Sequence, residues 1–163
     1  MKKRFCFVLL VISTMAGCTH TARLYPVQGP LSSQAPAPVI FGKISGVFYP
    51  GNISVVLSDG EVCRGRWAAV EPVQVPKGAT TTSVQVTADG MPSVWDTVYG
   101  AGFYVSHVLG ARYYAQVVAS GNRGTIFNVE MYRPRAEGED VDPISLIRGV
   151  ARDNKGNIYK LVL

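Results

Sequence analysis

The chain has 163 residues, of which 47% are hydrophobic and 17% are charged, and its formal net charge is +5. This length suits one domain with a hydrophobic core of its own. Three of the basic residues are Lys2, Lys3 and Arg4, and without them the net charge falls to about +2. A charge this small argues against a nucleic-acid-binding protein.

Residues 1–17 have the features of a secretory signal peptide. The basic residues precede an apolar run from Phe5 to Ala16, and small residues precede Cys18. The apolar run has roughly a dozen residues, whereas a membrane-spanning helix needs about 20. An ordinary cleaved signal would fit the first half of the segment equally well, but the Ala-Gly-Cys ending favours lipidation.

The stretch TMAGC at residues 14–18 resembles the lipobox of bacterial lipoprotein precursors. The resemblance implies cleavage before Cys18 and acyl chains, palmitate among them, on the sulfur and the new amine of this cysteine. In that family an aspartate after the cysteine favours the inner membrane, and this chain has Thr19 there. The expected location is therefore the periplasmic face of the outer membrane.

Residues 18–38 are expected to comprise the lipidated cysteine and a flexible tether. The segment holds four prolines with glycine and serine and shows no sustained apolar period, which is typical of an extended, solvated chain. Leu24 and Tyr25 could dock onto the folded part, so some of the tether could be ordered. The folded domain is predicted to span residues 39–163.

From Val39 onward the sequence predicts a mainly β domain, an antiparallel sandwich or barrel-like arrangement of hairpins with one short helix. Short runs rich in Val, Ile, Tyr and Thr alternate with turn residues. Hairpins are predicted at Ser58–Gly60, Gly121–Gly124 and Asp153–Asn157. The apolar end of the chain predicts that the strand Ile158–Leu163 lies inside the sheet.

The length of the first hairpin loop decides which side chains face the core. A two-residue loop would place Arg64 and Arg66 on the same face as Val55. A three-residue Ser-Asp-Gly loop pairs Val55 with Cys63 and turns both arginines outward. Burying two arginines is costly, and a one-residue slip exchanges the faces of a strand. The longer loop is therefore predicted, with Cys63 in the core as a small hydrophobe rather than a reactive thiol.

The stretch between Ser93 and Leu109 fits both helical and extended spacing. Helical spacing of the apolar residues at its start competes with Gly100, Gly102 and β-branched residues. A short helix at Ser93–Tyr99 followed by an extended segment is predicted.

Candidate catalytic and metal-binding residues are few. His107 follows Ser106, but neighbouring residues in a strand point to opposite faces, and no serine lies in a nucleophile-elbow pattern. Asp96 lies among aromatic residues and could cap a turn. The acidic segment 135–143 and the Asp153–Asn157 turn lack the pattern of a calcium loop. No catalytic residue, metal site or cofactor is predicted.

Arg64, Arg66 and Trp67 are the candidate binding residues. An outward arginine pair with an aromatic residue could grip phosphate or carboxylate groups, as on lipopolysaccharide or peptidoglycan. The alternative is a solvated strand face with Trp67 in the core.

These features predict a lipid-anchored cell-envelope protein that works by binding, as an accessory subunit or assembly factor of an envelope complex. Its expected partners are the membrane, through acyl chains on Cys18, and an envelope protein or cell-wall polymer, with no nucleic acid. The alternative function is a small periplasmic hydrolase acting on cell-wall material. A cleft gathering Asp96, His107 and a serine would favour the hydrolase.

Overall fold

The computed structural model describes residues 19–46, 51–69, 90–111, 113–134 and 146–163. These residues form a mainly β structure with one short α-helix, α1, at Met91–Tyr99, and a π-helical turn, η2, at Tyr104–Val108. The strands are β1 Thr19–Gln28, β2 Ile40–Ser45, β3 Asn52–Val56, β4 Val62–Arg66, β5 Ala68–Ala69, β6 Tyr113–Gly121, β7 Ile126–Arg133, β8 Arg148–Asp153 and β9 Ile158–Val162.

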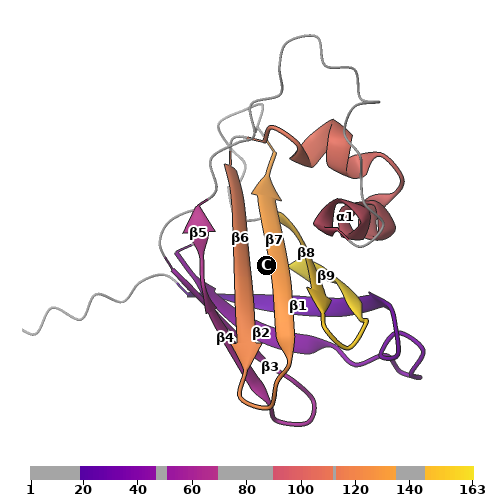
Figure 1. Cartoon of the computed structure of the whole chain (residues 1–163), viewed down its shortest axis with the longest axis vertical. Helices are drawn as coiled ribbons and strands as arrows, with labels where there is room; N and C mark the ends of the chain where they lie inside the picture. The colour runs from indigo at the N-terminus through magenta and orange to yellow at the C-terminus, as the bar shows by residue number, and fades with distance from the viewer. Residues whose placement is uncertain (1–18, 47–50, 70–89, 112, 135–145) are drawn as a thin grey trace, which may run out of the picture.

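The strands form a closed antiparallel barrel of eight strands, in the order β4-β3-β2-β1-β9-β8-β7-β6 (Figure 1). Pairing between β4 and β6 closes the ring, and the short β5 also pairs with β6. Cys63 lies opposite Gly121 and Ala68 lies opposite Gln116, so β4 and β5 keep one register along β6. The prediction of an antiparallel β domain is confirmed, and the architecture is the barrel rather than the sandwich.

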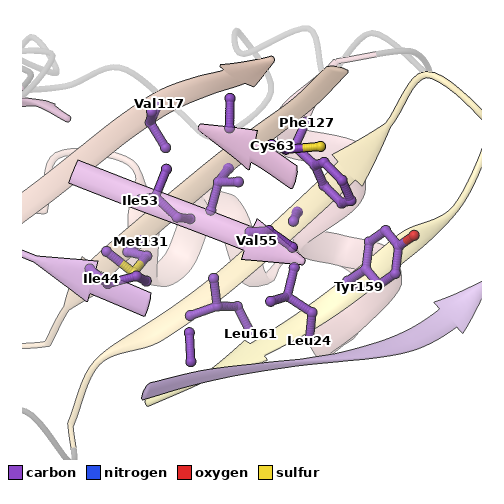
Figure 2. Packing of buried hydrophobic residues seen from close by; sticks show 14 of the residues in the cluster. Leu24, Ile44, Ile53, Val55, Cys63, Val117, Phe127, Met131, Tyr159 and Leu161 are labelled. Atoms are coloured by element: carbon purple, nitrogen blue, oxygen red, sulfur yellow. The ribbon is translucent and has the colours of Figure 1, made fainter. Parts of the chain in front are cut away.

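The barrel interior is filled by alternate side chains of its strands. Figure 2 shows Leu24, Val55, Phe127 and Leu161 pointing into a common core, and each of them is almost fully buried. The rings of Phe127 and Tyr159 lie 5.5 Å apart within this core. Because large apolar side chains occupy the inside, the surface available to partners is the outside of the barrel.

The predicted register of the first hairpin is confirmed. Val55 pairs with Cys63, and the fully buried Cys63 faces the core. Gly60 has a φ of 80°, the left-handed conformation that the three-residue loop requires. Arg64 and Arg66 are exposed on the outside. Burial also raises the pKa of the Cys63 thiol, which disfavours the reactive thiolate.

The other two hairpins and the position of the last strand are also confirmed. β6 pairs with β7, and β8 pairs with β9, through the predicted turns. β9 lies between β8 and β1, so the end of the chain is an interior strand of the sheet.

The predicted tether is wrong for residues 19–28, which form β1. This strand pairs with β2 on one side and β9 on the other, and Ala22 and Leu24 are fully buried. Proline does not interrupt the strand because Pro26 lies where the pairing with β9 shifts register. The other three prolines lie in the connection between β1 and β2. Within the described residues, the folded domain therefore extends back to Thr19, well before the predicted boundary at Val39.

The predicted helix is confirmed as α1, but the expected extended segment after it is wrong. The chain turns back and forms η2, because the Asp96 carboxylate accepts hydrogen bonds from the backbone N–H groups of Gly102 (3.0 Å) and Tyr104 (2.9 Å). The two helical segments lie on the outside of the barrel (Figure 1). There the buried side chains of Val94 and Trp95 pack with those of Tyr132 and Val150.

Candidate functional site

The end of the barrel formed by the β3–β4, β6–β7 and β8–β9 hairpins, called the hairpin end below, is closed by buried polar groups. Glu61 accepts hydrogen bonds from the backbone N–H groups of Arg123 (2.8 Å) and Thr125 (3.0 Å) and from the Thr125 hydroxyl. The Lys155 ammonium lies 3.6 Å from the same carboxylate. These donors, led by the Thr125 hydroxyl, lower the pKa of Glu61 to about 2.

Gly121 makes room for this carboxylate. A Cβ atom at Gly121 would meet Oε1 of Glu61 and would lie 2.9 Å from Sγ of Cys63. Since the backbone N–H groups of Arg123 and Thr125 hold Oε1 in place, the carboxylate has little freedom to move away. The position therefore requires glycine.

Asp153 and Asn157 extend the same network toward β1. The Asp153 carboxylate accepts hydrogen bonds from the backbone N–H of Lys155, from the backbone N–H and the side-chain amide of Asn157, and from the Tyr159 hydroxyl. The Asn157 side-chain oxygen accepts the N–H of Leu31 at 2.9 Å, in the β1–β2 connection. These oxygens are engaged in holding the hairpins together, which is a structural role for the Asp153–Asn157 turn.

Glu130 is a second buried glutamate, on the outer face of β7 beneath α1. Its carboxylate accepts the indole N–H of Trp95 at 2.7 Å and is hydrogen bonded to Tyr114. Burial raises the pKa of Glu130. With two side-chain donors and only 4% exposure, this acid is enclosed and cannot reach a substrate.

Asp96 and His107, the candidate residues of a catalytic site, serve separate local roles. The Asp96 carboxylate caps the turn between α1 and η2, as described above. His107 is exposed, its ring stacks on Phe103 with centroids 4.5 Å apart, and Nδ1 lies 3.3 Å from the Phe103 carbonyl oxygen. Ser106 is exposed beside it. The described contacts do not bring Asp96 and His107 together.

A hollow of about 430 Å³ lies outside the barrel between the start of α1 and the β8–β9 hairpin. It is lined by Met91, Asn128, Arg152, Asp153, Asn154 and Gly156. Asn154 uses its side chain to bind the N–H of Ile126 and the carbonyl of Gly124, and the Asp153 carboxylate is occupied as described. The side chains of Asp153 and Asn154 in this hollow therefore serve the hairpins.

The outer wall of β1–β4 is the most distinctive exposed surface. Three rows of outward side chains cross these strands: Arg23–Phe41–Val56–Val62, then Thr21–Lys43–Ser54–Arg64, then Thr19–Ser45–Asn52–Arg66. Successive rows are two residues apart along each strand, about 7 Å. The first row is called the apolar row below, and the other two are called the basic rows.

The apolar row exposes large hydrophobic side chains next to each other. Phe41 is 55% exposed and Val56, its direct partner on β3, is 51% exposed. Tyr25 and Val39 are exposed near the same end of the wall. Scattered exposed hydrophobic residues are ordinary on a protein surface, whereas a contiguous group marks an interaction site.

The basic rows carry Lys43, Arg64 and Arg66, all exposed, and the four strands of this wall contain no acidic residue. The wall is therefore positively charged, and the arginines that the sequence singled out lie on it. Trp67 does not lie with them. It is 4% exposed and belongs to the core, because alternation along the strand turns it inward after the outward Arg66.

Sequence reasoning missed the two buried glutamates and the apolar row. The alternating pattern around Phe41 was a usable signal, since Ile40, Gly42 and Ile44 face inward and leave Phe41 and Lys43 outside. Which residues of β1 and β3 lie beside Phe41 could be known only from the strand order.

Two further findings apply to the described part of the chain. It contains no group of three or more His, Cys, Asp or Glu side chains arranged to hold a metal ion. None of its helices has the length and hydrophobicity needed to cross a lipid bilayer. The predicted lipidation site, Cys18, and the acidic segment 135–143 lie outside the described residues.

Comparison with models of protein families, with curated proteins and with solved structures gives no significant match.

Proposed function

We propose that this protein is a lipid-anchored accessory protein of the bacterial cell envelope that binds an envelope protein through the outer wall of β1–β4. The observation that carries the proposal is the pair of exposed hydrophobic neighbours, Phe41 and Val56, on a wall that also carries basic residues. The interior of the barrel is packed with side chains, which favours binding on the outside over ligand capture within.

The chemistry of the apolar row favours a protein partner over a cell-wall polymer. Glycan strands are rich in hydroxyl groups, and in the apolar row only Arg23 offers them hydrogen-bonding groups. A protein partner can bury Phe41 and Val56 with apolar side chains of its own, as at the centre of a protein interface. Arg64 and Arg66 would then lie at the edge of the contact.

Anchoring at Cys18 is the second part of the proposal, and it rests on the lipobox resemblance at residues 14–18. Several acyl chains bind a membrane far more firmly than one. The anchor would keep the barrel at the periplasmic face of the outer membrane. Binding there needs no catalytic group, and Asp96 and His107 have structural contacts of their own, so the hydrolase alternative gains no support from their positions.

Site-specific photocrosslinking in intact cells tests the proposed binding surface. A photoreactive phenylalanine analogue would replace Phe41, and in a matched control it would replace Ile126, which is 41% exposed at the hairpin end. We expect a discrete crosslinked envelope protein from position 41 and none from position 126. The Val56→Ser variant should weaken the crosslink from position 41 severalfold without lowering the melting temperature much. Equal crosslinking from both positions would overturn the assignment of the surface.

A further inference from the structure

We infer that the basic rows of the β1–β4 wall contact the phosphate groups of the lipid leaflet that holds the anchor, so that the barrel stands on the membrane with its hairpin end pointing away. This inference rests on the proposed anchor at Cys18 and adds the orientation of the domain. The apolar row, farther from the anchor, then remains free for the protein partner.

The first argument is the lack of a spacer. β1 begins at Thr19, the residue directly after Cys18. Since Ala22 and Leu24 are fixed in the core, only Thr19, His20 and Thr21 can leave the sheet without opening the barrel. Acyl chains on Cys18 would therefore hold the first residues of β1 at the depth of the lipid headgroups.

The second argument is the position of the basic side chains relative to that point. Thr19 pairs with Ser45, the backbone N–H of Asn52 donates to the hydroxyl of Ser45 at 3.2 Å, and Asn52 pairs with Arg66. Arg66 therefore lies three strands from the anchor in the same row, about 14 Å away at the usual strand spacing.

The next row places two more exposed cations at a similar distance. Lys43 pairs with Thr21, and Arg64 pairs with Ser54 beside it. A lysine or arginine near an anionic membrane surface strengthens binding by about fivefold.

The third argument is the distribution of the acids. Asp59, Glu61 and Asp153 all lie at the hairpin end. The ten-residue strand β1 runs from Thr19 toward that end and is about 33 Å long. The hairpin end also carries Arg123 and Lys155 beside Asp59 and Glu61, whereas the four strands of the wall carry cations and no acid. The excess of positive charge therefore lies on the wall near the anchor. This polarity matches a membrane that carries negative charge.

The test measures the height of two sites above the bilayer, using the full-length lipidated protein in vesicles of phosphatidylethanolamine and phosphatidylglycerol at a ratio of three to one. Single cysteines are introduced as Thr21→Cys in the second row and Ser58→Cys at the hairpin end, and each is labelled with the same fluorophore. Cys63 is buried and should not react. Lipids with spin-labelled headgroups quench fluorophores that lie close to them.

We expect quenching of the label at position 21 to exceed that at position 58 by at least threefold. The excess should fall by at least half in phosphatidylcholine vesicles, in 0.5 M NaCl, and in the Lys43→Gln/Arg64→Gln/Arg66→Gln variant. The control Arg123→Gln, which removes one positive charge at the hairpin end, should leave it unchanged, and the single variant Arg66→Gln, which removes one charge near the anchor, should lower it.

Mass spectrometry of the N-terminal peptide separates the two ways in which the idea could fail. Suppose that Cys18 is acylated but the two labels are quenched equally, or that the difference in quenching does not change with lipid charge or with the triple substitution. Either result would overturn the orientation and leave the anchor standing. If Cys18 carries no acyl chain, the anchor and the orientation are both overturned.

Discussion

Glu61 at the hairpin end and Glu130 beneath α1 are both almost fully buried, yet their surroundings shift their pKa values in opposite directions. Glu61 accepts two backbone N–H groups and a hydroxyl and has Lys155 nearby, and its pKa falls to about 2. Glu130 has the Trp95 indole and Tyr114 as donors, and burial raises its pKa.

The difference teaches that donors and nearby charge, rather than burial itself, decide whether a buried carboxyl is ionised. At neutral pH the ionised Glu61 carboxylate stabilises the fold at the hairpin end. Beneath α1, ionisation of Glu130 lowers the stability of the folded state. The proposed membrane and partner surfaces involve neither glutamate, so both can be altered without touching the β1–β4 wall.

The largest expected effect comes from Glu61→Ala. The change leaves the N–H groups of Arg123 and Thr125 without their acceptor inside the structure, and unpaired buried donors are costly. We expect a larger loss of unfolding free energy than from any other substitution below, measured by urea denaturation at pH 7. Glu61→Gln, which keeps an acceptor, should lose less. Equal stability of Glu61→Ala and the wild type would show that the network contributes nothing.

The two glutamates also give opposite pH dependences. The folded pKa of Glu61 lies below its unfolded value of 4.5, so its contribution is complete above that value and is lost as the pH falls from 4.5 toward 2. The free energy of unfolding of the Glu61→Gln variant should therefore fall less between pH 4.5 and pH 2 than that of the wild type. An identical loss of stability between pH 5 and pH 2 in the wild type and this variant would contradict the assignment.

Trp95→Phe is expected to cost about 2 kcal/mol, because it removes the donor to Glu130 and leaves a small cavity in the helix layer. The cost should be greater at pH 8 than at pH 4, since the lost hydrogen bond stabilises the ionised carboxylate most. Thermal unfolding at the two pH values measures this difference. In a Glu130→Gln background the pH dependence of the cost should disappear, and its persistence there would point to another acid.

Glu130→Gln is expected to stabilise the protein slightly at neutral and alkaline pH. The raised folded pKa means that wild-type stability declines as the pH rises above 4.5 and through the folded value. Glutamine can still accept the Trp95 N–H and carries no charge. The gain should vanish below pH 4, where both states of the wild-type acid are protonated. A variant that is less stable than the wild type at pH 8 would show that the charged form is favoured.

The smallest expected effect is that of Lys155→Gln. The ammonium lies 3.6 Å from Glu61, but the lysine side chain is half exposed, and such ion pairs contribute about 0–1 kcal/mol. A loss within that range, shrinking in 0.5 M NaCl, is expected from urea denaturation. A loss as large as that of Glu61→Ala would mean that the charge, rather than the backbone donors, dominates the network.

Local sequence patterns correctly predicted the hairpins and their faces. The turn at Ser58–Gly60 and the cost of burying Arg64 and Arg66 were enough to place Cys63 inside, because strand register and turn length are properties of a few adjacent residues. The exposed arginines of the candidate surface could therefore be predicted. The helix at α1 followed from apolar spacing in the same way.

Contacts between distant segments were decided only by the tertiary structure. The prediction of a tether rested on the four prolines of residues 18–38, of which only Pro26 lies in β1. The pairing of β1 with β9, more than a hundred residues away, cannot be seen in local composition. The neighbours of Phe41 and the donors to Glu61 and Glu130 likewise come from other strands and hairpins. The sequence alone determined the periodicity and the turns, since these depend on near neighbours. The closure of the barrel, the wall of β1–β4 and the opposite shifts of the two glutamates depend on which strands meet, and this is settled by packing across the whole chain.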